Sequence, residues 1–124
     1  MTSVLVDTSV WRKFFRGVRA VRGLSDLLDE DGAVWIHPFV LGELVLGGIS
    51  PAQEALFRRL PAPKVLDHDD VLEFVRRREL MRRGIGWVDA HLLASSLTGE
   101  ARLWSADVKL AKAAAELDVE FPSA

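Results

Sequence analysis

The chain has 124 residues, of which 49% are hydrophobic and 27% charged, and its formal net charge at pH 7 is −2. This length and composition exclude a disordered or fibrous chain and predict one domain over residues 1–124 with a buried core. The absence of cysteine excludes disulfides and thiolate metal sites, and no apolar run approaches the roughly 20 residues that span a bilayer, so we expect a cytoplasmic protein without membrane contact.

Short apolar runs predict the strands. They have the continuous apolar character of strands that are covered on both faces of a parallel sheet. In chain order the runs are Ser3–Val6, Ala33–Ile36, Lys64–Leu66, Arg102–Trp104 and a weaker one at Val119–Phe121.

Helical patterns separate these runs. The first expected helix spans about residues 18–30, and the second begins at Pro38 and ends near residue 46. A third begins at Ser50, which has the capping-box spacing to Gln53, and continues to about residue 60. A long helix capped by Asp69 or Asp70 reaches residue 83, and two more span residues 87–97 and 106–117.

Alternating strands and helices imply parallel pairing with right-handed crossovers. The predicted fold class is therefore α/β, a three-layer α/β/α sandwich with a mainly parallel central sheet of four to five strands. Ligands of such sheets bind beyond the carboxyl ends of the strands. This is where we look for acidic side chains.

Two acids follow strands and two interrupt apolar helices. Asp7 comes directly after the first predicted strand, and Asp107 follows Arg102–Trp104 closely. Glu43 and Asp89 lie in apolar stretches, and no lysine or arginine occurs in residues 40–49 or 84–97. Buried carboxylates need a compensating partner. A hard divalent cation such as Mg²⁺ or Mn²⁺ would satisfy several of them at once.

Each acid also has a purely structural interpretation. Asp7, Asp89 and Asp107 each stand where a helix starts, so each is also a candidate helix cap. Glu43 is also compatible with a solvated position on its helix. A common cation is the one explanation that accounts for all four together.

Four segments carry a resemblance to a known family. They are "VLVDTSVW", "HPFVLGELVLG", "GIGWVDAHLLASSL" and "ARLWSADVKLAKAA", and they contain the four acids in order. In these motifs the whole chain resembles the PIN-domain family and, within it, the VapC-type toxins of toxin–antitoxin pairs.

The resemblance implies a Mg²⁺- or Mn²⁺-dependent endoribonuclease that leaves a 5′-phosphate and a 3′-hydroxyl. By motif match the metal-site acids are Asp7, Glu43, Asp89 and Asp107, and Thr8 or Ser9 occupies the hydroxyl position of the first motif. The resemblance also implies a cognate VapB-type antitoxin that blocks the site, and a toxin homodimer. Many relatives place a small hydroxyl residue before the second-motif glutamate, whereas this chain has Pro38 and Phe39.

Basic residues follow Asp7 without an intervening acid. Arg12, Lys13 and Arg16 are predicted RNA contacts, and the basic segment continues to Arg22. A second cluster over residues 76–83 is interpreted as a solvated helix face. His91 is interpreted as structural or peripheral.

Some apolar side chains exceed what one small core can bury. Phe14 and Phe15, together with residues 40–46, are candidates for a dimer or antitoxin groove.

The main alternative to a ribonuclease is a non-catalytic PIN-like module that binds protein or RNA, which an incomplete set of acids would indicate. A haloacid-dehalogenase-type phosphatase is excluded because Ser9 stands where its second aspartate is required.

Overall fold

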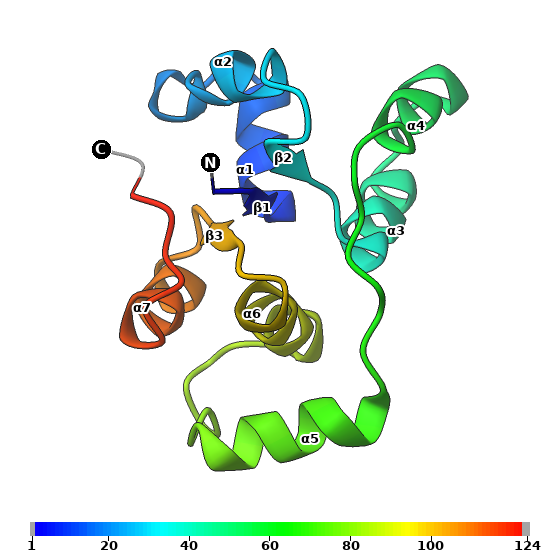
Figure 1. The fold of residues 1–124 in the computed structure, drawn as a ribbon. Coiled ribbons are helices and arrows are strands. Elements are labelled where there is room, and N and C mark those ends of the chain that lie inside the picture. Colours follow the sequence, from blue (N-terminus) through cyan, green and yellow to red (C-terminus); the bar gives the residue numbers. More distant parts are fainter. Residues whose placement is uncertain (1, 123–124) are drawn as a thin grey trace.

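The computed structural model describes residues 2–122 and alternates strands with helices (Figure 1). In chain order the elements are β1 (Val4–Val6), α1 (Thr8–Phe15), the 3₁₀ helix η1 (Arg19–Val21), α2 (Leu24–Leu28), β2 (Val34–Trp35), α3 (Pro38–Leu46), α4 (Pro51–Phe57), α5 (His68–Arg77), α6 (Trp87–Thr98), β3 (Arg102–Trp104) and α7 (Val108–Glu116). None of the helices in this part of the chain is long and apolar enough to cross a membrane.

The sheet is parallel, and β1 is its central strand. The strand order is β2-β1-β3, with Val4 opposite Val34 on one side and Val6 opposite Trp104 on the other. All three β1 side chains are buried, as expected for a strand that is covered on both faces. In Figure 1, α1 and α2 lie on one side of the sheet and α6 and α7 on the other, which confirms the predicted three-layer α/β/α arrangement.

The sheet is narrower than the four to five strands expected. The segment before residues 64–66 pairs with the residue that follows β2, because the Pro61 carbonyl accepts a hydrogen bond from Ile36 N at 2.9 Å. Residues 64–66 form no strand, because Pro63 supplies no N–H with which to continue a ladder beside β2. The weak run at Val119–Phe121 makes one parallel bridge, between Glu120 and Leu103 of β3.

Two helices differ from the expected boundaries. The first expected helix is divided at Gly23 into η1 and α2. The long helix before Trp87 begins at His68, one residue after its N-cap Asp67, and ends at Arg77. Positive φ angles of 54° at Glu79 and 63° at Arg82 turn the chain away from the helix axis. The Ser50–Gln53 capping box of α4 is present as predicted.

Candidate active site

Asp7 is the most firmly held of the four acids. It follows β1 directly and is only 6% exposed. Its Oδ1 accepts a hydrogen bond from Thr8 N at 2.8 Å, and its Oδ2 accepts from Ser9 Oγ at 2.6 Å and from Ser105 Oγ at 2.9 Å. Its backbone N–H donates to Trp104 O at 2.9 Å, so Asp7 is anchored to the neighbouring strand β3 as well as to β1.

Ser105 is a site residue that the sequence analysis did not identify. Besides its bond to Asp7, its hydroxyl accepts from Asp107 N at 3.0 Å. Ser9 bridges the same two segments, because its Oγ accepts from Ala106 N at 2.9 Å. The signal in the sequence was a hydroxyl residue immediately after the strand Arg102–Trp104, which is the position that Asp7 holds after β1.

Glu43 reaches the site from α3. The Thr8 hydroxyl donates to Glu43 Oε1 at 2.7 Å, which ties this half-buried carboxylate to the turn that holds Asp7. The N-terminus of α3 is fixed by Pro38 at its first turn and by His37, whose Nδ1 accepts from Phe39 N at 2.9 Å. In this chain the hydroxyl partner of Glu43 therefore comes from Thr8, while Pro38 and Phe39 shape the helix start.

Asp89 and Asp107 both lie at helix starts. Asp89 Oδ2 accepts from Gly86 N at 3.0 Å in the first turn of α6. Asp107 caps α7, because its Oδ1 accepts from Lys109 N at 2.9 Å and from Leu110 N at 3.1 Å. The structural interpretation of Asp107 as a cap is thus confirmed. Its second carboxylate oxygen remains available for another role.

The other three carboxylates act on Asp89. Burial raises the pKa of Asp89 above its usual value, the Gly86 N–H opposes this, and the charges of Asp7, Asp107 and Glu43 raise it further. Within residues 2–122 no lysine, arginine or histidine forms an ion pair with any of the four. The site therefore gathers negative charge that no protein cation neutralises.

The carboxylates of the site are widely spaced. Among the described residues, no three acid or histidine side chains lie close enough together to hold one ion directly. The donor set is nevertheless all oxygen and uncompensated, which suits a hard cation that keeps some of its water ligands.

Two buried histidines lie on the helices that carry Glu43 and Asp89: His37 is the N-cap of α3, and His91 is on α6. Burial, with a smaller contribution from His91, lowers the pKa of His37 to about 4. Burial, together with His68, also lowers the pKa of His91. The His91 ring packs edge-on against Phe39 and Trp87, with ring centroids 4.8 and 5.1 Å apart. His91 is thus part of the packing between α3 and α6, in line with its structural interpretation.

The proposed RNA-contact residues lie on α1 and at its C-terminal end. Arg12 and Arg16 are exposed and Lys13 is half-buried. No ion pair involves them within residues 2–122. Arg16 is the C-cap of that helix, and the assignment of the three residues as RNA contacts stays a prediction.

An apolar groove runs between α1 and α4. It has a volume of about 230 Å³ and includes Phe14 and Phe15. Its other side is formed by α4 and Leu28 rather than by residues 40–46 as expected; Val45 and Leu46 are exposed elsewhere on α3. Phe15 is 45% and Leu56 61% exposed, so the groove presents bulky apolar side chains to solvent.

Comparison with known proteins agrees with this architecture. The model of the PIN domain family matches residues 4–116. Two curated relatives, both named Ribonuclease VapC32 and from the CDC 1551 / Oshkosh and H37Rv strains of Mycobacterium tuberculosis, are 45% identical over 119 residues, which is 94% of this chain and of each relative.

Two solved structures share the fold. A chain of a toxin-antitoxin complex from Klebsiella pneumoniae has a TM-score of 0.63 at 20% identity and covers 86% of this chain and 88% of its own. PAE2754 from Pyrobaculum aerophilum has a TM-score of 0.60 at 13% identity, with 90% and 84% covered.

Proposed function

Because the chain belongs to the PIN domain family, we propose that it is a VapC-type endoribonuclease toxin that hydrolyses RNA phosphodiester bonds with an activated water. The observation that carries this proposal is the group of four carboxylates whose charges act on Asp89 without a protein cation to neutralise them. The 45% identity to proteins named Ribonuclease VapC32 supports RNA as the substrate.

The proposed cofactor is Mg²⁺ or Mn²⁺, held by Asp7, Glu43, Asp89 and Asp107. When bound, such an ion lowers the pKa of a water molecule and neutralises charge on the scissile phosphate. The uncompensated oxygen donors fit a hard cation, and the absence of cysteine leaves no soft ligand in the chain.

The protein side chains orient these donors. Ser9 and Ser105 hold one oxygen of Asp7, and Thr8 holds one oxygen of Glu43, so hydrogen bonds orient both carboxylates. We propose that Arg12, Lys13 and Arg16 on α1 bind the RNA backbone beside the carboxylates, since phosphate contacts come mainly from lysine and arginine.

The test compares Asp7→Asn with Asp31→Asn, a change of the same chemistry at an exposed loop position. In cells that produce each variant, sequencing of RNA 5′ ends should show new ends with the wild type and Asp31→Asn and none with Asp7→Asn. Purified protein should cleave RNA only with added Mg²⁺ or Mn²⁺. Equal cleavage by the two variants would refute the catalytic assignment, and no cleavage by any form would favour the non-catalytic PIN-like module.

We also propose that the groove between α1 and α4 binds an antitoxin of the VapB type. Its exposed aromatic and aliphatic side chains match the apolar face of an amphipathic helix, which is a common way for a short segment to dock. The similar fold of a chain in a toxin-antitoxin complex supports a partner of this class.

The proposed homodimer is tested separately by sedimentation of the isolated chain, where a monomer at all concentrations would refute it.

A further inference from the structure

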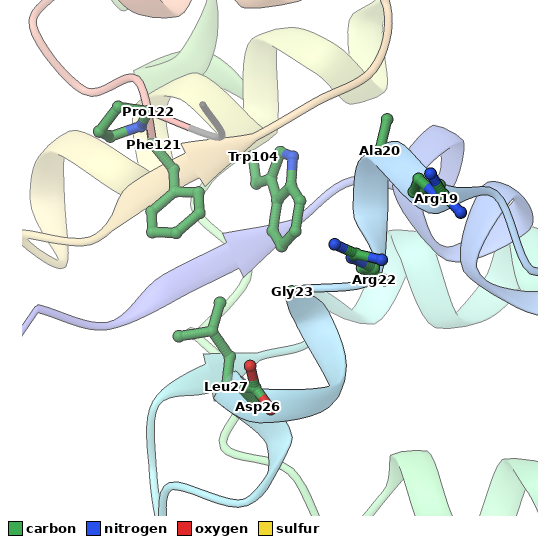
Figure 2. A pocket seen from close by; sticks show the side chains of 9 residues that line it. All are labelled: Arg19, Ala20, Arg22, Gly23, Asp26, Leu27, Trp104, Phe121 and Pro122. Carbon is green, nitrogen blue, oxygen red and sulfur yellow. The ribbon is translucent and has the colours of Figure 1, made fainter.

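A second cavity, larger than the apolar groove, shares no lining residue with it. It has a volume of about 790 Å³, within the range typical of small-ligand sites. The walls come from segments far apart in the sequence: η1 and the start of α2, the end of β3, and the chain at Phe121 and Pro122. Figure 2 shows Phe121 and Trp104 together, with Arg22 facing them across the opening.

One side of this cavity is basic. Arg19 and Arg22 both line it and both are exposed, and within residues 2–122 neither forms an ion pair. Asp26 is the one acid in the lining. The excess of positive charge suits an anionic ligand, while a carboxylate acceptor beside it suits a ligand that also carries N–H or O–H donors.

The other side is aromatic and apolar. The rings of Trp104 and Phe121 pack with centroids 5.1 Å apart, and Leu27 lies beside them in the lining. Trp104 is only 4% exposed and serves as the floor. Phe121 is half-buried and presents apolar surface to the cavity. A flat, apolar ring system fits against such a wall, as nucleic-acid bases do on aromatic side chains.

The cavity is joined to the carboxylate site through the backbone. Trp104 is the last residue of β3, and its carbonyl accepts the hydrogen bond from Asp7 N. The next residue, Ser105, donates its hydroxyl to Asp7 Oδ2. Trp104, which lines the cavity, and Ser105, which holds Asp7, are therefore consecutive residues.

We propose that this cavity binds one nucleotide of single-stranded RNA, with its base against Phe121 and its phosphate between Arg19 and Arg22. Binding there would also help to select the cleavage position. That second role rests on the proposed nuclease function, whereas nucleotide binding itself does not. The occupant is a nucleotide rather than a bare anion because charge and an apolar wall face each other across the same space.

Nucleotide binding is testable by NMR without any catalysis. The chain has four tryptophans, so ¹⁵N labelling gives four indole N–H signals, and that of Trp104 is assigned by its loss in Trp104→Phe. Uridine 5′-monophosphate and a three-nucleotide oligouridylate should shift the Trp104 signal in EDTA while the signal of Trp11, at the far groove, stays in place. A shift with inorganic phosphate alone, or no shift with either nucleotide, would overturn the proposal.

The role in cleavage is tested by steady-state kinetics. Arg22→Gln and Phe121→Ala should each raise KM for a single-stranded RNA by at least about fivefold, since stacking and phosphate contacts have effects of this size, with little change in kcat. Arg59→Gln removes an exposed arginine outside the cavity and should leave KM unchanged. Because Arg22 is exposed, its replacement should not affect folding even if Phe121→Ala does.

The two proposals fail in different ways. If RNA is cleaved but Arg22→Gln matches Arg59→Gln and the Trp104 signal does not move, the subsite is wrong and the nuclease assignment stands. If no RNA is cleaved under any condition but nucleotides still shift Trp104, the nuclease assignment is wrong and the nucleotide subsite stands.

Discussion

Replacing Ser105 by alanine removes two hydrogen bonds at the candidate active site and little apolar packing. The lost donor serves a carboxylate, Asp7, that is 6% exposed, and the lost acceptor serves the N–H of Asp107, which water can replace. A hydrogen bond to a charged group contributes about 1.5–3 kcal/mol. We therefore expect the free energy of unfolding to fall by about 1.5–3 kcal/mol.

A second serine provides the matched control. Ser96 on α6 is fully buried, and its hydroxyl has no hydrogen-bond partner among the described residues. Ser96→Ala makes the same chemical change, but it removes an unsatisfied polar group, so stability should stay the same or rise. The contrast between the two variants separates hydrogen bonding to Asp7 from the general effect of deleting a hydroxyl.

Urea unfolding in EDTA, followed by tryptophan fluorescence, measures both variants. The reasoning is refuted if Ser105→Ala lies within about 0.5 kcal/mol of the wild type, the range of an ordinary surface change, or if Ser96→Ala loses as much as Ser105→Ala. For the proposed nuclease, Ser105→Ala should also lower activity about 10–100-fold, because residues that orient metal ligands have effects of this size.

Three further results are expected. The first concerns the raised pKa of Asp89 in EDTA: the contribution of this group to stability is fully present below the unfolded pKa of 3.8 and is lost as pH rises through the higher folded value. In urea titrations from pH 3 to 7, Asp89→Asn should remove this pH dependence, and at pH 7 the variant should be more stable than the wild type. The lowered pKa of His37 gives a pH dependence of the opposite sign, so the free energy of unfolding should fall as pH drops from about 6.5 to about 4. His37→Asn can still cap α3 and should flatten that slope, whereas an unchanged slope would exclude His37 as its source. Leu56→Glu, at a 61% exposed groove position, should leave the thermal midpoint unchanged but abolish co-purification with a co-expressed antitoxin, and retained binding would place the partner elsewhere.

The sequence was sufficient for the layers of the fold and for the choice of acids to examine. Asp7 and Asp107 follow strands that proved to be neighbours, and Glu43 and Asp89 interrupt apolar helices without a basic residue nearby. Both signals are local, so they can be read before the chain is folded. Whether these acids bind metal is still a prediction.

Other features depend on contacts that local patterns do not encode. Ser105 meets Asp7 only because β3 pairs with β1 in a register that places Trp104 opposite Val6. The leucine spacing of residues 24–28 suggests one long helix, yet the chain divides at Gly23. The sequence predicted that the helix before Trp87 reaches residue 83, whereas α5 ends at Arg77. Glu79 and Arg82 beyond it adopt positive φ, which is uncommon for such residues and has no signal in the sequence.

The hydrogen bonds on Asp7 also limit how many further bonds it can accept. A carboxylate has about four lone-pair sites, and Thr8 N, Ser9 Oγ and Ser105 Oγ already occupy three of them. One site remains, so Asp7 can serve an incoming ion through a single oxygen and cannot chelate it with both. Large ions that favour two-oxygen carboxylate ligation, such as Ca²⁺, are thereby disfavoured relative to a small octahedral ion. If Asp7 is a metal ligand as proposed, two serine hydroxyls that are not ligands themselves would then set its preference among cations.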